Sequence, residues 1–205
     1  MRRTKQESEA TRQGLLAAAR RVFARSGVTR TTLEHVAAEA GVTRGAIYWH
    51  FANKKALFDA MREQVSIPLI DCTDYALLAS TEPDPLAAVE KFLGGLLASV
   101  ANDSVTRHTF QIMMLKCEYV DEFAPELIRQ AAHWGELEAK LRKIYTRARR
   151  ANALRRDLTP ATAALHTCVF VSGLMRLWLL DEGGRLIRRR ARRLIAAHVE
   201  AHRRA

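Results

Sequence analysis

The segment Thr32–Lys55 constrains the fold of this chain most, because its apolar residues follow the period of two short helices separated by a tight turn. The hydroxyl group of Thr32 can cap the first helix, and that of Thr43 can cap the second. Gly41 stands between them, where a helix commonly ends in the left-handed conformation that glycine tolerates. Two helices joined at a steep angle by a short glycine-containing turn form a helix-turn-helix, so we expect that motif here.

The expected packing of these two helices leaves one surface of the second helix outside. The residues expected to face inward are Leu33, Val36, Ala37, Ala40, Ala46, Ile47 and Phe51. Arg44, Tyr48, Trp49 and His50 then remain exposed on a single short helix, which indicates a binding surface. Two alternatives stay open: Tyr48 or Trp49 anchors the core, or the segment is an ordinary helical hairpin without a partner.

If the second helix enters a DNA groove, its side chains can be assigned roles. Arg44 is the predicted bidentate contact to guanine, Thr43 and Tyr48 can reach bases or phosphates, and Ala46 can meet a thymine methyl group. The other residues are expected to hold phosphates or to shape the edge of the surface, which positions the protein without encoding sequence. The predicted DNA-binding set is Thr32, Thr43, Arg44, Gly45, Ala46, Tyr48, Trp49, His50, Lys54 and Lys55.

The residues from Gly41 to Phe58, GVTRGAIYWHFANKKALF, resemble the DNA-binding domain of the tetracycline-repressor (TetR) family. VTRGAIYWHF, together with the TRQ of the first helix, is especially similar to the multidrug-efflux regulators of the AcrR type. Two later stretches, LKCEYVDEF at Leu115–Phe123 and VSGLMRLWLL at Val171–Leu180, also look like that subgroup. The similarity is strong over about the first 60 residues and patchier beyond them.

The resemblance implies an all-α fold with two domains. A three-helix helix-turn-helix DNA-binding domain (residues 1–55) is joined by a long fourth helix to a helical ligand-binding and dimerisation domain (residues 56–205). The residue pattern agrees, because no run alternates convincingly as a strand does. Besides the two helices of the motif, the expected helices cover about 8–26, 54–67 with a kink or break at Pro68, 85–101, 105–119, 125–151, 160–180 and 185–203.

The net charge is divided unevenly along the chain, which bears on its partners. Residues 1–65 carry +6, residues 66–140 carry −7 and residues 141–205 carry +12. The basic first block fits a domain that contacts phosphates. In the third block, the apolar stripe of residues 186–199 can pack against a partner helix, with the arginines as a solvated rim. An arginine-biased composition would give the same pattern.

For the second domain, the resemblance implies a large, mostly apolar pocket that accepts varied hydrophobic molecules. Aromatic and methionine side chains suit such a pocket, although each of them can equally be plain core. The predicted ligand-binding set is Asp71, Phe110, Met113, Met114, Cys117, Trp134, Phe170, Met175 and Arg176.

We expect neither a cofactor nor a metal site. Cys72, Cys117 and Cys168 are widely separated and lack ligand spacing. His198 and His202, four residues apart near the chain end without a third ligand, are expected to be solvated. No catalytic motif is present, which argues against an enzyme.

The function expected from these features is that of a ligand-responsive repressor. It would bind a palindromic double-stranded DNA operator as a homodimer through the last two helices, and a hydrophobic small-molecule inducer would release it. The resemblance favours control of a multidrug-efflux or detoxification operon. The alternative is an architectural DNA-binding protein without a ligand. The polar start, residues 1–13, predicts a cytoplasmic chain, and residues 161–180 are expected to be an interface helix rather than a membrane span.

Overall fold

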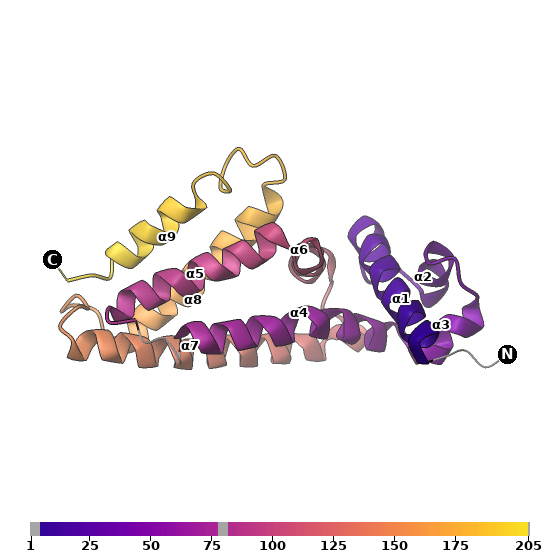
Figure 1. Cartoon of the computed structure of the whole chain (residues 1–205), viewed down its shortest axis with the longest axis horizontal. Coiled ribbons are helices and arrows are strands. Elements are labelled where there is room, and N and C mark those ends of the chain that lie inside the picture. The colour runs from indigo at the N-terminus through magenta and orange to yellow at the C-terminus, as the bar shows by residue number, and fades with distance from the viewer. Residues whose placement is uncertain (1–4, 78–81, 205) are drawn as a thin grey trace. The chain divides into compact units, whose positions relative to one another are not determined.

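The computed structural model describes the backbone of residues 5–77 and 82–204, and the side chains of residues 5–65 and 82–204. Within that part of the chain every regular element is helical, apart from one isolated bridge between Leu154 and Arg203. The predicted all-α class is therefore confirmed (Figure 1). The elements are α1 (Lys5–Ser26), α2 (Leu33–Glu39), α3 (Arg44–His50), α4 (Lys54–Leu77), α5 (Pro85–Asn102), α6 (Ser104–Gln111), the π-helical turn η1 (Ile112–Lys116), the 3-10 turn η2 (Asp121–Phe123), α7 (Pro125–Arg150), α8 (Pro160–Leu180) and α9 (Ala191–Glu200).

The chain folds into two compact units that are not continuous in sequence. The first contains residues 1–67 and 104–125, and the second contains residues 68–103 and 126–205. The domain boundary at residue 55 that we expect from the sequence remains a prediction about the functional domains. The compact units follow a different division, because α6, η1 and η2 belong to the same unit as α1, α2 and α3.

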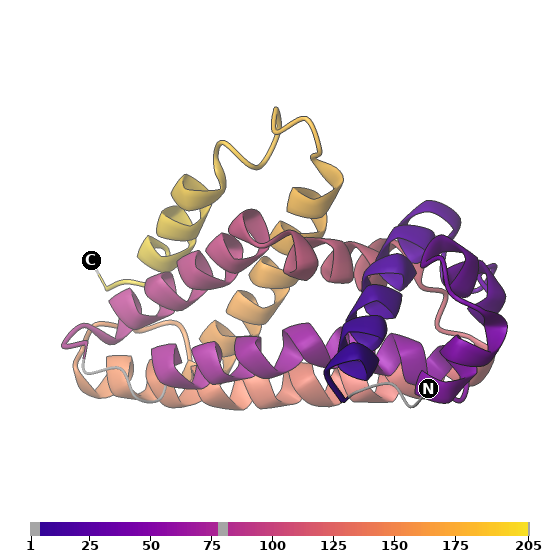
Figure 2. The same cartoon turned by 45° about the vertical axis from the view of Figure 1, so that its right-hand side comes forward.

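The core of the first unit is built from segments far apart in sequence. Phe23 of α1, Ile47 of α3, Phe58 of α4 and Ile112 of η1 are all fully buried in one cluster. The rings of Phe58 and Phe123 meet edge to face with centroids 5.2 Å apart. Figure 2 shows α6 beside α1. Burying each such aromatic or aliphatic side chain stabilises the fold by roughly 1.5–3 kcal/mol, so residues 104–125 are an integral part of this core.

In the second unit, α9 packs along α5 and α8 (Figure 1). Its buried residues Ala191, Ile195 and Val199 recur every four residues and so lie on one face of the helix. Arg203, just after α9, pairs with Asp84, the N-cap residue of α5, at 2.7 Å. Burial acts to raise the pKa of Asp84, but the contact with Arg203 together with backbone hydrogen bonds at the start of α5 lowers it overall. The end of the chain is thus tied to the start of α5.

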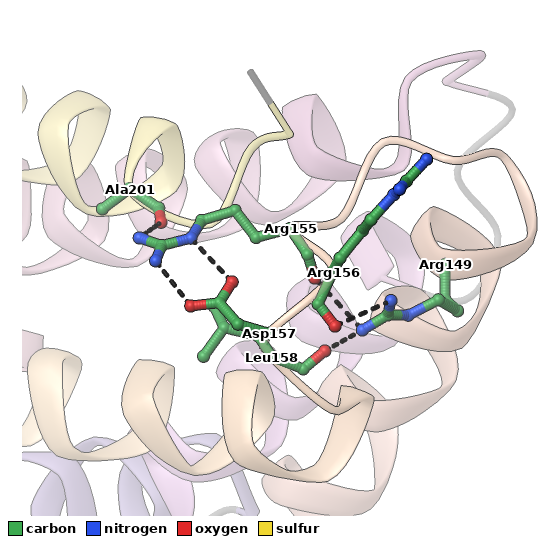
Figure 3. Close-up of polar contacts among 6 residues, drawn as sticks. All are labelled: Arg149, Arg155, Arg156, Asp157, Leu158 and Ala201. Carbon is green, nitrogen blue, oxygen red and sulfur yellow. Dashed lines mark hydrogen bonds and ion pairs between the residues drawn. The ribbon is translucent and has the colours of Figure 1, made fainter.

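The connection between α7 and α8 is held by two arginines (Figure 3). Arg149 donates hydrogen bonds to the carbonyl oxygens of Arg155, Arg156 and Leu158. Arg155 pairs with Asp157 at 2.6 Å and also donates to the carbonyl oxygen of Ala201 at 3.3 Å. These contacts satisfy carbonyl groups that a loop otherwise leaves to water, and they fix the start of α8 relative to the end of α9.

Three helix boundaries differ from the sequence prediction by more than three residues. α4 continues through Pro68 to Leu77, because a helix can accommodate one proline at the cost of one backbone hydrogen bond. The helix expected to reach Tyr119 ends as α6 at Gln111 and continues as a π-helical turn to Lys116. The last helix begins at Ala191 rather than near residue 185, since Asp181 accepts the backbone N–H groups of residues 185–188 and holds them in turns.

α8 is the one helix of the described residues that is long and apolar enough to span a bilayer by length and composition. Half of its most apolar window is buried within the protein. The core helix of a soluble protein passes the same test, so this property alone is weak evidence for a membrane span.

Candidate nucleic-acid interface

Side-chain caps start both helices of the predicted motif. Thr32 accepts the backbone N–H of His35 at 3.3 Å, and His35 Nδ1 accepts the backbone N–H of Thr32 at 3.4 Å, which forms a reciprocal capping box. Thr43 accepts the backbone N–H of Ala46 at 3.2 Å. Such a cap contributes roughly 1 kcal/mol to a helix of this length. The predicted capping roles of Thr32 and Thr43 are confirmed.

The turn between α2 and α3 depends on Gly41. Its φ of +68° lies in the left-handed region, and the N–H of the next residue, Val42, returns to the carbonyl oxygen of Ala37 at 3.0 Å. Leu33, Val36 and Ile47 are buried beneath the turn. The two helices therefore cross closely, as a helix-turn-helix requires, and α3 presents its opposite face to solvent.

The exposed face of α3 carries two of the predicted base-contacting side chains, Arg44 and Tyr48. Trp49 is 82% exposed and Tyr48 is 44% exposed, so the alternative that either of them anchors the core is wrong. Arg44 is exposed as well, with its guanidinium 5.5 Å from the centroid of the Tyr48 ring. Apart from its chain neighbours and the nearby backbone of α3, no atom lies within 4 Å of the position that a Cβ of Gly45 would take, so the backbone is open to close approach at that point.

Glu34 of α2 organises this face, a role that the sequence pattern did not indicate. One of its carboxylate oxygens accepts from Tyr48 Oη at 3.1 Å and lies 3.2 Å from Arg44 Nε. Backbone hydrogen bonding of Glu34 and then the Tyr48 hydroxyl hold the pKa of Glu34 below its usual range. The carboxylate therefore stays charged at neutral pH and orients both α3 side chains.

The remaining predicted DNA contacts include exposed, half-buried and internally paired residues. Lys54 donates to the carbonyl oxygen of Thr29 at 3.1 Å and lies 3.5 Å from a carboxylate oxygen of Glu122. Lys55 pairs with Asp59 at 2.8 Å. Thr43 and Gly45 are exposed, whereas Ala46 and His50 are half-buried. To contact DNA, either lysine would have to exchange its partner within the protein for a phosphate group.

The structure divides the predicted ligand-binding residues between the two units. Four of them belong to the first unit, where Met113 and Cys117 pack against the helix-turn-helix core while Phe110 and Met114 are half-buried. The other four with described side chains belong to the second unit: Trp134, Phe170, Met175 and Arg176. The side chain of Asp71 lies outside the described residues. Met175 is buried and Arg176 is exposed.

A groove of about 550 Å³ runs along α7 and α8 in the second unit. Of the predicted ligand-binding residues with described side chains, Trp134 is the one that lines this groove. A volume of this size accommodates a drug-sized molecule. Its other lining residues are Gly135, Glu138, Leu165, Cys168, Val169 and Ser172.

The prediction that His198 and His202 are solvated is wrong. His202 is 3% exposed, and its Nδ1 donates to the carbonyl oxygen of His198 at 2.7 Å. The His198 ring stacks on Phe170 with centroids 4.1 Å apart and contacts Thr167 Oγ1 at 3.0 Å. Burial, with smaller contributions from His202 and His166, lowers the pKa of His198 to about 4. A spacing of four on an amphipathic helix was the available signal for this inward face.

Relatives of known classification are similar over most of the chain. The regulator TtgR of Pseudomonas putida is 39% identical over 88% of this chain and 85% of its own length. The regulator AcrR of Shigella flexneri is 34% identical over 98% of this chain and 93% of its own length. The predicted similarity to the AcrR type is thus confirmed.

Solved structures share the fold as well as the sequence. NalD, the secondary repressor of the MexAB-OprM multidrug efflux pump in Pseudomonas aeruginosa, superposes with a TM-score of 0.81 at 30% identity, covering 97% of this chain and 98% of NalD. SmeT in complex with triclosan superposes with a TM-score of 0.79 at 27% identity, covering 95% of this chain and 92% of SmeT.

Two family descriptions match the chain. Residues 15–61 match bacterial regulatory proteins of the tetR family, and residues 84–203 match the C-terminal region of MAATS-type transcriptional repressors. The first match contains the capped helices and the exposed face of α3, and the second covers more than half of the chain. The protein therefore belongs to the TetR family of bacterial transcriptional regulators, in its MAATS-type repressor branch, and not to a family of enzymes.

Proposed function

We propose that this protein represses a multidrug-efflux or detoxification operon by binding a palindromic operator as a homodimer, and that a hydrophobic small molecule releases it. The observation that carries the proposal is the exposed face of α3, where Glu34 orients Arg44 and Tyr48 beside the fully accessible Trp49. The fold leaves most of this face open to solvent, since Trp49 is 82% exposed and the Arg44 side chain is 75% exposed. Its guanidinium and aromatic groups suit base edges and phosphates.

A face of α8 supports the homodimer. Large apolar side chains remain exposed along it at helical spacing, and Gly173 among them has open space around its Cβ position. A contiguous exposed apolar stripe of this kind marks an interface, and a glycine lets a second helix approach closely. The proposed partner is the same face of a second copy, joined by α9 through the exposed Leu194. The apolar residues on α8 are Leu165, Val169, Leu177 and Leu180.

The proposed inducer is a hydrophobic small molecule. The groove along α7 and α8 offers Trp134 and Cys168 as apolar surface, with Glu138 and Ser172 as the polar groups that fix orientation. Leu165 and Val169 line both this groove and the dimer face of α8, so in the proposed dimer the second copy covers part of the open side of the groove. The complex of the relative SmeT with triclosan supports this class of ligand. NalD and SmeT are both repressors of multidrug efflux pumps, which supports an efflux operon as the target. We place the action in the cytoplasm, where bacterial DNA lies.

The proposal is tested by titrating the purified protein against the DNA next to its own gene and against a scrambled duplex of equal length, at fixed salt. A panel of neutral and cationic hydrophobic compounds, triclosan among them, is then added. We expect a specific-to-nonspecific affinity ratio of at least about 10³, reduced roughly 5- to 150-fold by one or more compounds. Equal affinity for both duplexes, unaffected by any compound, would instead support the architectural alternative.

A further inference from the structure

The polypeptide passes between the two compact units three times, at residues 67/68, 103/104 and 125/126. Residues 104–125 therefore lie in the first unit while both flanking segments, the end of α5 and the body of α7, belong to the second. We call residues 104–125 the inserted segment. Any rearrangement of α5 or α7 acts on this segment through covalent bonds at both of its ends.

A buried arginine of α1 contacts the inserted segment. Arg20 is 7% exposed, and its Nε donates to Thr109 Oγ1 of α6 at 3.2 Å. Its Nη2 donates to Gln64 Oε1 of α4, and the amide group of Gln64 donates in turn to Gln13 of α1 at 2.6 Å. Thr109 is fully buried. One guanidinium group thus joins α1, α4 and α6 by hydrogen bonds. These bonds are directional, whereas apolar contacts are not.

Two other contacts of the inserted segment with α1 and its following turn are of a different kind. Ile112 packs in the core, and the carbonyl oxygen of Lys116 accepts the backbone N–H of Val28 at 3.0 Å. The packing of Ile112 is non-directional and tolerates small shifts along the helix, and the backbone hydrogen bond is made to the turn after α1 rather than to α1 itself. The hydrogen bond from Arg20 Nε to the buried hydroxyl group of Thr109 depends more sharply on position, because hydrogen bonds weaken steeply with angle and distance.

α1 in turn contacts the helix-turn-helix through ion pairs and shared core packing. Arg21 and Arg25 of α1 both pair with Glu39 of α2, at 2.7 and 3.2 Å, and Phe23 lies in the same core as Val36 and Ile47. Since Arg20 adjoins Arg21 in sequence, a shift of α1 at Arg20 is passed to α2 and α3 without an intervening loop.

We propose that Arg20 is a positioning residue that couples the inserted segment to the DNA-binding helices. The coupling runs from α6 through Thr109 and Arg20 to α1, and from α1 to α2 and α3. It rests on the proposed function, in which the protein has a DNA-bound and a released state. Because coupling between two sites is reciprocal, DNA bound at α3 must also stabilise the inserted segment through Arg20.

The test uses this reciprocity and needs no inducer. Amide hydrogen exchange of the full chain is measured with and without a saturating DNA duplex, for the wild type, Thr109→Val and Arg20→Lys. Thr109→Val keeps the side-chain shape but removes the acceptor, and Arg20→Lys keeps the charge but removes the fork. We expect DNA to slow exchange in residues 104–116 roughly five- to tenfold in the wild type and less than about twofold in both variants. Slowing in residues 33–50 should persist in all three.

Two further variants distinguish a loss of coupling from a general loss of stability. Thr109→Ser restores the hydroxyl group and should restore the slowing. Thr167→Val removes an equally buried, hydrogen-bonded hydroxyl group in the second unit and should leave the slowing of residues 104–116 intact. The inference is overturned if residues 104–116 are protected by DNA equally in the wild type, Thr109→Val and Arg20→Lys, or in none of them. Failure of the proposed function appears separately, as equal affinity for the operator and a scrambled duplex.

Discussion

One carboxylate oxygen of Glu34 accepts the Tyr48 hydroxyl group and lies 3.2 Å from Arg44 Nε. A residue of α2 thereby positions two side chains of α3 before any DNA is bound. Because ordering a long side chain costs about 0.5–1.5 kcal/mol on binding, part of this cost is already met in the free protein.

Replacing Arg44 by alanine should weaken specific binding far more than nonspecific binding. A bidentate contact to guanine discriminates by about 1–3 kcal/mol, so we expect a loss of roughly 5- to 150-fold on the operator. Binding to scrambled DNA should fall only slightly. Fluorescence anisotropy titrations on the two duplexes measure both values, with the exposed Arg142→Ala of α7 as the control. An equal loss on both duplexes contradicts the assignment of Arg44.

Glu34→Gln should lower the specific-to-nonspecific ratio while leaving the stability of the fold nearly unchanged. An exposed ion pair contributes little to stability, but its loss releases Arg44 and removes one negative charge near DNA, while the amide oxygen of glutamine can still accept the Tyr48 hydroxyl group. Nonspecific affinity should therefore rise. Glu39→Gln on the same helix is the matched control, because Glu39 pairs with Arg21 and Arg25 of α1 instead. If both variants change the ratio equally, Glu34 has no orienting role.

Gly45→Ala should stabilise the free protein and weaken its complex with DNA. The added methyl group meets no atom within 4 Å beyond its chain neighbours and the nearby backbone of α3, and alanine is favoured over glycine in a helix by about 1 kcal/mol. The same methyl group would stand between α3 and any DNA pressed against it. Thermal unfolding and operator titration test the two effects together. A variant with higher Tm and unchanged operator affinity would show that α3 does not approach DNA at Gly45.

Val169→Glu should convert the proposed dimer to a monomer. Val169 is 74% exposed on α8, and a carboxylate buried there on pairing would lose its hydration without gaining a partner. We expect operator affinity to fall by at least tenfold, since one recognition helix replaces two. Sedimentation velocity gives the mass of each species. Ile128→Glu, at a side chain that is 76% exposed on α7, is the control and should remain dimeric.

Acidification should destabilise the protein partly through His198. Its pKa is about 4 in the folded chain, whereas an imidazole in an unfolded chain takes up a proton below about pH 6.5. Between these two values the unfolded state binds more protons, so the free energy of unfolding falls as the pH falls from 6.5 to 4.

His198→Gln should reduce this sensitivity to acid. We expect its Tm to drop by about 2–4 °C less than that of the wild type between pH 7.5 and pH 5. His202, whose pKa is also lowered by burial, accounts for part of the remaining drop. Replacement of His133, exposed on α7, is the control. Identical pH profiles of wild type and His198→Gln would contradict a neutral, buried His198.

The helix-turn-helix could be predicted because its signals are local. Caps at Thr32 and Thr43, a glycine at the turn and apolar residues at helical spacing each act within a few residues, and the structure shows all of them in place. The exposed positions of Tyr48 and Trp49 followed from the same periodicity.

What the sequence did not predict depends on contacts between distant segments. The pairing of Glu34 with Arg44, the burial of His202 and the Arg20–Thr109 contact join residues whose neighbours no local pattern specifies. The predicted ligand residues were chosen by chemical type alone. Methionine and aromatic side chains also fill ordinary cores, and Met113 packs in the core of the first unit for that reason.

The most direct test of the central claim is the binding of the purified protein to its operator and to the same operator with five base pairs inserted at its centre. Half a helical turn of extra DNA places the two half-sites on opposite faces of the duplex. We predict two chains bound to the intact operator and an affinity lower by roughly 100-fold or more for the lengthened one. Equal affinity for the two duplexes would contradict a dimer whose paired α3 helices recognise a palindrome.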